Sequence, residues 1–350
     1  MPLSVIKYSA VTAKIKAMYS KLLTSDQYDI LMTKHSVGEI VAWLKESPGY
    51  SNVLSVLNEN SVHRGDFEKV FQVSLLSDGE KIAKMLGRNE RNLLNLLLSS
   101  YEYEELKLII RSIRTGDKIP QSVFTVYDKV HIGKSKNLDL WKCYESRNMA
   151  ELVDNLRGTK YYSLLRVYAA DGSDATPLDI EMSMDAHYLL RLVSATKDYL
   201  SRSEMKNAED FFGREIDILN LMWIYRCRKY YKFTREGTLN HIIPFNYKMS
   251  KDDVYKLAGS STDEFKEIAR SSKYGSIFAP EDDMLWDQKL TEYLYKLYRR
   301  HFTTDMFSFT TVLAYIYLKG IDINNIITII EAVRYGLNAT EIKKYLTVIR

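Results

Sequence analysis

The segment Asp322-Ile-Asn-Asn325-Ile-Ile-Thr-Ile329 decides the fold of this chain. Its apolar residues follow the i, i+3, i+4, i+7 spacing that places side chains on one face of an α-helix: Ile323, Ile326, Ile327 and Ile330. The acid and the asparagine, three residues apart, also share a face. The segment therefore predicts a helix that buries an aliphatic stripe together with two polar groups.

This pattern occurs twice more in the chain. Asp217-Ile-Leu-Asn220-Leu-Met-Trp-Ile224 repeats the acid, the asparagine three residues later, and the aliphatic residues that follow. A weaker copy, Glu102-Tyr-Glu-Glu105-Leu-Lys-Leu-Ile109, keeps the acid and the aliphatic pair but has glutamate in place of asparagine. The three apolar stripes end at a similar distance after their acid, at Gly116, Tyr231 and Gly336. The shared spacing indicates an internal repeat.

A second sequence element is repeated as well. Asn155–Leu165 matches Ile268–Phe278, with a Lys-Tyr pair followed by serine in both, and Leu44–Tyr50 is a looser copy. Another amphipathic helix lies upstream of each acidic helix, carrying Asp66, Asp185 or Asp287.

Together these elements predict three related helical units, at residues 1–130, 131–245 and 246–350. An opening helix at Tyr8–Leu23 and a closing helix near Thr340–Ile349 are expected as well. Each unit is longer than a TPR or HEAT repeat, so a regular solenoid is disfavoured.

The composition supports an all-α fold. The chain has 350 residues, 46% hydrophobic and 27% charged, which is typical of a protein with a sizeable core and excludes disordered, collagen-like and disulfide-stapled classes. No convincing alternating strand pattern occurs. Prolines fall where periodic runs stop, and glycines lie beside expected helix ends. These residues are Pro48, Pro120, Pro177, Pro244, Pro280, Gly116, Gly320 and Gly336.

Charge and cysteine usage exclude further classes. Lys plus Arg is 49 and Asp plus Glu is 45, a mixed balance of +4 that lacks the clustered excess of a nucleic-acid binder. Cys143 and Cys227 form neither a CxxC pair nor a disulfide framework. Lysines interrupt the N-terminal segment, and the longest uncharged stretch, Met306–Leu318, is shorter than the roughly 20 residues that cross a bilayer. We expect no direct membrane span.

No catalytic, cofactor-binding or metal-binding residue is predicted, and no cofactor. The acid–asparagine pairs fit a structural role, with the acid near a helix start and a semi-buried asparagine joining helices. Asp282-Asp283-Met-Leu-Trp286-Asp287 resembles the magnesium-binding motif of isoprenoid synthases but has Trp286 at an acidic position, and Asp252-Asp253 supplies no second motif. These acids after Pro280 are expected to begin a helix.

Scattered histidines give no HExxH pattern or i, i+4 pair for a metal: His35, His63, His131, His187, His241 and His301. Walker A, GxSxG and Rossmann motifs are also absent.

Two basic aromatic stretches, Tyr225–Lys232 and Tyr295–His301, carry residue types that bind single-stranded nucleic acid. On helices, however, their aromatic and cationic residues separate onto different sides, as a core stripe with a solvated face requires. We expect no nucleic-acid binding.

The order and number of these elements resemble the C subunit of archaeal and bacterial V/A-type ATPases, the counterpart of the d subunit of eukaryotic V-ATPases. Tyr8-Ser-Ala-Val-Thr-Ala-Lys-Ile-Lys-Ala17 is similar to the amino-terminal helix of that family, with lysines where arginines are commoner. The Leu–Tyr elements and the acidic helices followed by Arg228-Lys229-Tyr230 or Arg334-Tyr335-Gly336 resemble its repeated signatures. The likeness covers essentially the whole chain.

The resemblance implies a funnel-like body of three pseudo-symmetric helical bundles without a catalytic centre. It would sit peripherally on the cytoplasmic mouth of the membrane rotor ring and receive the central-shaft subunits, of D and F type. It would thus couple ATP hydrolysis or synthesis to H⁺ or Na⁺ transport. The alternatives are a free-standing helical binding module for RNA or another protein assembly and, more remotely, an isoprenoid-type enzyme. The sequence does not identify individual partner-binding residues.

Overall fold

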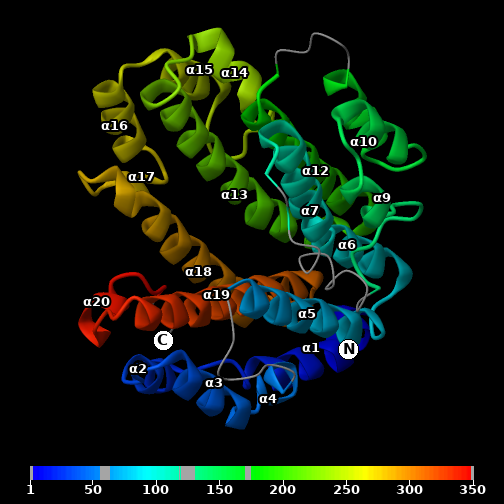
Figure 1. Cartoon of the computed structure of the whole chain (residues 1–350), viewed down its shortest axis with the longest axis vertical. Helices are drawn as coiled ribbons and strands as arrows, with labels where there is room; N and C mark the ends of the chain where they lie inside the picture. Colours follow the sequence, from blue (N-terminus) through cyan, green and yellow to red (C-terminus); the bar gives the residue numbers. More distant parts are fainter. Residues whose placement is uncertain (1–2, 56–63, 118, 120–130, 170–174, 348–350) are drawn as a thin grey trace. The chain divides into compact units, whose positions relative to one another are not determined.

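The computed structural model describes residues 3–55, 64–117, 119, 131–169 and 175–347. Throughout these ranges the chain forms helices, turns and loops and no β-strand, which confirms the all-α prediction (Figure 1). Two compact units are present. The first comprises Met1–Arg88, Val126–Val130 and Met284–Arg350, and the second comprises Asn89–Thr125 and His131–Asp283.

The first unit is built around one long central helix. Its helices are α1 (Leu3–Tyr19), α2 (Ser25–Met32), α3 (Val37–Glu46), α4 (Ser51–Leu54), α5 (Arg64–Ala83), α18 (Trp286–Thr304), α19 (Phe309–Arg334) and α20 (Ala339–Lys343). α19 packs against α1, α2, α3, α5, α18 and α20, and Figure 1 shows α5 running beside it. The isoleucine stripe lies on this helix, with Ile323, Ile326 and Ile330 buried and Ile327 half-buried, and the neighbouring helices cover most of the helix surface. Contact on all sides explains why α19 is apolar around its circumference.

By length and composition alone, α19 is also apolar enough to cross a membrane, and it is the one such helix in the described part of the chain. Of its most apolar window, 72% is buried inside the protein. Burial by neighbouring helices accounts for the same composition, as in the core helix of a globular protein.

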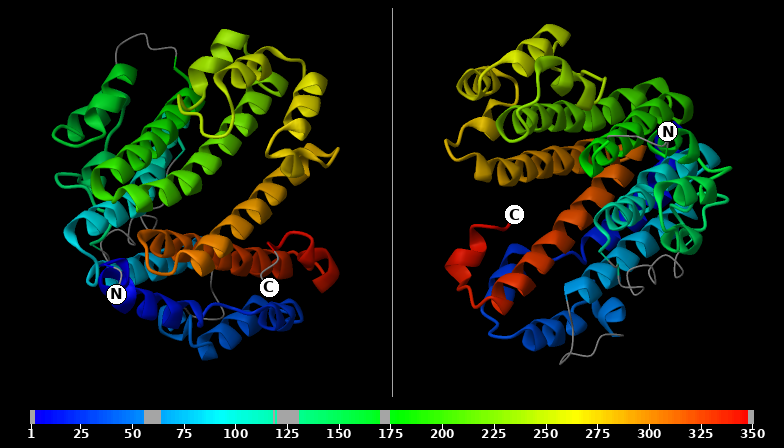
Figure 2. Two further views of the ribbon diagram at one scale, coloured as in Figure 1. Left: turned by 180° about the vertical axis from the view of Figure 1, so that it is seen from behind. Right: turned by 45° about the horizontal axis from the view of Figure 1, so that its top comes forward.

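The second unit contains three long helices and several short ones. They are α6 (Arg88–Leu98), α7 (Ser100–Thr115), α9 (Leu140–Tyr144), α10 (Met149–Asn155), α11 (Tyr162–Leu165), the 3₁₀ turn η2 (Arg166–Tyr168), α12 (Pro177–Tyr199), α13 (Arg202–Lys229), α14 (Arg235–His241), α15 (Lys251–Gly259), α16 (Thr262–Ser271) and α17 (Gly275–Phe278). α12 packs against α7 on one side and α13 on another, and Figure 2 shows α12 and α13 side by side in both views. The shorter helices α14, α15 and α16 pack on α13.

Local sequence signals fix many of these helix ends. Thr176 caps α12 through a reciprocal capping box with Asp179, and Pro177 occupies the first turn, where its missing N–H costs nothing. Gly116 ends α7 with φ of 79°, and Gly336 follows α19 with φ of 74°, both in the left-handed region.

Gly320 lies inside α19, so its expected position beside a helix end was wrong; the apolar stripe continues through it and the helix does not stop. Pro48, Pro244 and Pro280 do follow helix ends, whereas Pro120 lies outside the described residues.

Both terminal helices end earlier in the chain than the sequence predicted. α1 ends at Tyr19 before Leu23, because the backbone N–H of Leu23 donates to a carboxylate of α19 at 3.3 Å. α20 ends at Lys343, and the backbone of Thr347 instead bonds Asn325 of α19. In both places a tertiary hydrogen bond takes the backbone group that a longer helix would have used.

Candidate functional site

The repeated acids and the repeated tyrosines meet in the structure. In each case a fully buried tyrosine hydroxyl donates to a buried carboxylate, an arrangement that we call a carboxylate–tyrosine pair. The three pairs are Tyr161 with Glu102, Tyr274 with Asp217 and Tyr50 with Asp322. The second element is therefore the hydrogen-bonding partner of the first.

The order of the partners differs among the pairs. In two of them the tyrosine follows its acid along the chain, by 59 and 57 residues. Tyr50 instead precedes Asp322 by 272 residues, so the first tyrosine element serves the last acidic helix. The near-equal separations of the first two pairs were a signal in the sequence, whereas the third pairing carried none.

Glu102 lies on the first turn of α7 and is contacted by donors from two other segments. Its carboxylate accepts hydrogen bonds from the Ser135 backbone N–H at 2.5 Å, the Ser135 hydroxyl at 2.6 Å and the Tyr161 hydroxyl at 2.6 Å. The Lys160 ammonium lies 3.5 Å away. The tyrosine ring also packs edge-on against Tyr103, with centroids 4.9 Å apart. Burial raises the pKa of Tyr161 well above its usual range, and the negative charge of Glu102 adds to the effect, so the hydroxyl remains a donor.

Asp217 is 1% exposed and accepts four hydrogen bonds. Three come from consecutive backbone N–H groups, those of Tyr247 at 2.9 Å, Lys248 at 2.6 Å and Met249 at 3.1 Å. The fourth comes from the Tyr274 hydroxyl at 2.8 Å. A single side chain therefore holds the loop between α14 and α15 against α13.

Asp322 is fully buried at the middle of α19. Tyr28 and Tyr50 each donate a short hydrogen bond to one of its oxygens, and the Leu23 N–H adds a third donor. Burial raises the pKa of Asp322 to about 6, and these hydrogen bonds limit the rise because they favour the charged form.

The repeated asparagines bind backbone in the same way. Asn220 donates from Nδ2 to the Ile243 carbonyl at 2.9 Å and accepts from the Ile243 N–H at 2.8 Å. Asn325 makes the equivalent two bonds to Thr347, both at 3.0 Å. Each asparagine thus satisfies both backbone groups of one buried residue, as the predicted structural role requires.

One part of that prediction was wrong. Asp217 and Asp322 were expected near helix starts, but they lie in the interiors of α13 and α19. The N–H groups that they accept belong to neighbouring segments and not to the first turn of their own helix. The apolar stripes continue on both sides of each acid, so the helices start well before it.

The hydrogen bonding limits what these carboxylates can do chemically. A carboxylate offers about four lone-pair sites, and Asp217 has four donors from its own chain. A general base or a metal ligand needs a free lone pair that faces a substrate or an ion. Among the described residues, no group of three or more His, Cys, Asp or Glu side chains could hold a metal ion. The pairs act as interhelical connections.

The acidic stretch after Pro280 divides between two roles. Asp287 lies in the first turn of α18, as expected for an acid at a helix start. Asp283 lies before that helix, in the 3₁₀ turn η3 (Asp283–Leu285), and accepts from Lys229 at 2.6 Å and from Tyr230 at 3.2 Å. The hydrogen bond from Lys229 holds the pKa of Asp283 below its usual range. The acid is therefore committed to an ion pair at the end of α13.

Part of each basic aromatic stretch is engaged within the protein. Arg228 donates to the backbone carbonyls of Phe233 and Ser260, and Lys229 is bound to Asp283. On α18, Tyr295 and Tyr298 are buried. Two cations of the first stretch are therefore engaged inside the protein, whereas Tyr230 and Tyr231 at its end are exposed.

Three of the histidines make hydrogen bonds between or within helices. His187 bonds the Tyr103 hydroxyl at 2.9 Å, His241 bonds Asp179 at 2.5 Å and His301 bonds Asp305 at 2.7 Å. His35 and His131 are exposed, and His63 lies outside the described residues. Both cysteines are buried thiols.

Comparison with known proteins finds related sequences over nearly the whole chain. Residues 11–345 match the ATP synthase (C/AC39) subunit family. The chain is 22% identical to the C subunit of the A-type ATP synthase of Archaeoglobus fulgidus, over 98% of this chain and 96% of that protein. It is also 22% identical to the corresponding C subunit of Thermococcus kodakarensis, over 97% of this chain and 90% of that protein.

A shorter alignment with higher identity is found with the A-type ATP synthase C subunit of Methanococcoides burtonii. The two sequences are 27% identical over 63% of this chain and 59% of that protein. The family match spans the acidic helices, the tyrosine elements and the asparagines described above. The chain therefore belongs to the C/AC39 subunit family of ATP synthases, as its resemblance to the C subunit of V/A-type ATPases indicated.

Proposed function

We propose that this protein is the non-catalytic central-stalk adaptor of a V/A-type rotary ATPase. It would sit peripherally on the cytoplasmic side of the membrane and join the central-shaft subunits, of D and F type, to the membrane rotor ring. In this position it would couple ATP hydrolysis or synthesis to the transport of H⁺ or Na⁺. The observation that carries the proposal is the family match over residues 11–345.

The internal contacts suit a mechanical part. A coupling between shaft and ring must transmit torque without slipping, and close-packed helices deform little under load. Each carboxylate–tyrosine pair adds a fixed connection between segments that are distant in the sequence, such as α19 with Tyr28 and Tyr50. The hydrogen bonding of these carboxylates supports a non-enzymatic role, because Asp217 accepts from four donors of its own chain and Glu102 and Asp322 each accept from three.

We also propose that the chain consists of three related helical units that together form a funnel-like body. The three carboxylate–tyrosine pairs support this, because each joins one acidic helix to one tyrosine element. The predicted boundaries at 1–130, 131–245 and 246–350 stay a prediction. Since Tyr50 pairs with Asp322, the last unit would be completed by residues from the start of the chain.

Removal of the protein from a purified complex tests the proposal. ATP hydrolysis by the soluble catalytic part should persist, while ATP-driven ion uptake into vesicles should stop and return when the protein is added back. Intact ion pumping without the protein would refute the proposal. A control preparation that has been through the same dissociation and reassembly with every component present separates this effect from damage.

A binding assay separates the adaptor from an RNA-binding module. The immobilised protein should retain shaft subunits and ring, and its affinity for oligonucleotides should be weak at physiological salt. Tight oligonucleotide binding that falls steeply with salt concentration, without retention of the shaft, would favour the RNA module instead.

A further inference from the structure

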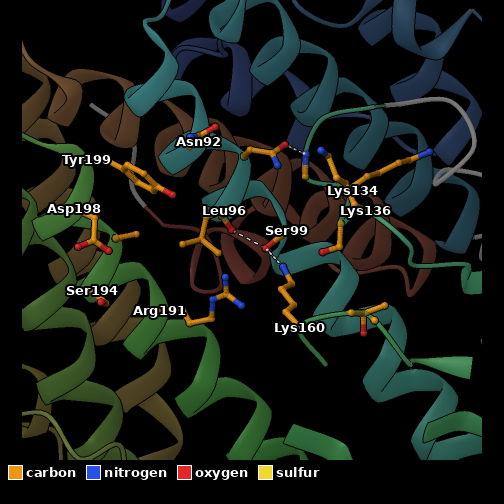
Figure 3. A pocket seen from close by; sticks show the side chains of 16 residues that line it. Asn92, Leu96, Ser99, Lys134, Lys136, Lys160, Arg191, Ser194, Asp198 and Tyr199 are labelled. Atoms are coloured by element: carbon orange, nitrogen blue, oxygen red, sulfur yellow. Dashed lines mark hydrogen bonds between the residues drawn. The ribbon is translucent and has the colours of Figure 1, made fainter. Parts of the chain in front are cut away.

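The second unit contains a polar cavity of about 590 Å³ that the proposed coupling role does not use. Its wall is formed by α6, residues 133–136, residues 158–160 and the last part of α12 (Figure 3). All of these segments belong to one compact unit. The volume is within the range of small-molecule sites in proteins.

The lining of this cavity is strongly cationic. It contains the side chains of Lys134, Lys136, Lys160 and Arg191, against one lining carboxylate, Asp198. In the part of the chain that the structure describes, Arg191 and Lys136 have neither a hydrogen-bond nor an ion-pair partner. Figure 3 shows Arg191 and Lys160 entering the cavity from different elements, with the Lys160 ammonium directed at Ser99. Cations gathered in a concave site focus a positive potential there.

The loop that carries two of these lysines is held in a defined shape. Gly133 has φ of 80°, and a Cβ at that position would lie 2.6 Å from the Leu98 carbonyl oxygen, so only glycine fits. Its N–H donates to Asn95 Oδ1 at 2.6 Å. Two residues later, Ser135 is bound to Glu102 through both its N–H and its hydroxyl. Lys134 and Lys136 flank that anchored serine, so the carboxylate–tyrosine pair also positions the wall of the cavity.

The third lysine, Lys160, is partly buried, and its surroundings disfavour its positive charge. Lys160 donates to the Ser99 hydroxyl at 2.9 Å and lies over the rings of Tyr161 and Tyr103 at 4.9 and 5.2 Å. Burial lowers the pKa of Lys160; the neighbouring Glu102 opposes this effect and the charge of Arg191 adds to it. Nearby, burial together with the charges of Arg191 and Lys160 lowers the pKa of His187 to about 4. Both effects would diminish if an anion occupied the cavity.

At the corresponding place in the first unit, a cavity-lining lysine is paired with an acid of the same chain. There a cavity of about 190 Å³ lies beside Tyr50, and Lys319, three residues before Asp322, lines it. The Lys319 ammonium is bound to Asp78 of α5 and to the Ser74 hydroxyl at 2.9 Å. Asp78 in turn accepts from the Tyr315 hydroxyl at 2.7 Å. In this copy the chain itself provides the anion.

The larger cavity has no lysine at the position equivalent to Lys319. Ser99, three residues before Glu102, stands where the other copy has Lys319, and the cations are supplied by Lys160 and by Arg191 of α12. Asp198 lines the cavity and Glu102 lies 3.5 Å from the Lys160 ammonium, so two carboxylates stand against four cationic side chains. The difference between the copies leaves a space that is both open and positively charged.

We propose that this cavity binds a small phosphorylated anion that carries at least two negative charges, with Arg191, Lys160, Lys134 and Lys136 contacting its oxygens. A guanidinium group matches the geometry of phosphate oxygens, and the lining asparagine and serine side chains add neutral donors. A diphosphate-class ligand fits the charge count better than a single carboxylate, which would offset only one of the cations. The proposal does not depend on the coupling role.

Isothermal titration of the full-length protein with inorganic pyrophosphate at about 150 mM salt, a physiological ionic strength, tests this site. We expect saturable 1:1 binding, with citrate, an anion of similar charge that lacks phosphoryl groups, at least tenfold weaker. Arg191→Gln and Lys136→Gln should each weaken pyrophosphate binding about tenfold or more. Both side chains are exposed, so the variants should fold normally, which circular dichroism checks.

Arg202→Gln is the matched control, because Arg202 is an exposed arginine of the same unit outside the cavity. Its affinity should equal that of the unmodified protein. A parallel titration with ADP distinguishes a nucleotide from free diphosphate as the source of the phosphoryl groups. Absence of saturable pyrophosphate binding, equal binding of citrate, or unchanged binding in Arg191→Gln would overturn the proposal.

Discussion

The buried carboxyl of Asp322 should make the protein less stable as the pH rises toward neutrality. Its pKa in the folded protein is about 6, against an ordinary value of 3.8 in an unfolded chain. A group with a raised folded-state pKa binds its proton more tightly in the folded protein. Its stabilising contribution is therefore complete below the unfolded pKa and is lost as the pH rises through the folded pKa.

The replacement Asp322→Asn tests this effect, because the amide keeps the shape of the side chain but does not titrate. The expected size of the effect follows from the difference between the two pKa values. Between roughly pH 5 and pH 7.5, the free energy of unfolding of the unmodified protein should fall by about 1.4 kcal/mol relative to that of the variant. The contributions of the other titrating groups are common to both proteins and cancel in the difference.

Urea unfolding followed by tryptophan fluorescence measures that difference. Trp286 is fully buried in the same unit as Asp322 and reports on its unfolding. A second variant, Tyr28→Phe, removes a hydrogen bond that lowers the pKa of Asp322, so its loss of stability should extend to higher pH. A pH-independent difference between the unmodified protein and Asp322→Asn, or one of opposite sign, would refute the reasoning.

Three further predictions concern single contacts. Tyr161→Phe and Tyr274→Phe should each lower the free energy of unfolding by about 1.5–3 kcal/mol, since each removes a hydrogen bond to a buried charged group; chemical denaturation measures this, and losses below about 0.5 kcal/mol in both would contradict it. Gly133→Ala should destabilise by at least about 2 kcal/mol more than Gly116→Ala, because both glycines have positive φ but only Gly133 lies against backbone; equal thermal shifts would argue against the close approach. Burial raises the pKa of Cys143 to about 12, so a thiol reagent at about pH 8 should label this residue in urea but not in the folded protein, and rapid native labelling would show that the site opens.

The helical fold and the internal repetition could be read directly from the order of the amino acids. Apolar spacing identified the helices around Ile109, Ile224 and Ile326, because side chains that share a helix face must share a period, whatever they pack against. Recurrence of short segments also marked the acids and the tyrosines as two separate sets of repeated elements. Hydrophobic periodicity is a local property, so it is readable without knowledge of the neighbours.

The choice of partner for each buried polar group emerged only from the packing of the helices. No local signal pairs Tyr50 with Asp322 across 272 residues, and none stops α1 at Tyr19 so that the Leu23 N–H reaches the same carboxylate. The cationic cavity likewise combines lysines and an arginine from three separate segments. A buried polar group takes whichever partner the packing brings within reach, and linear spacing does not encode that choice.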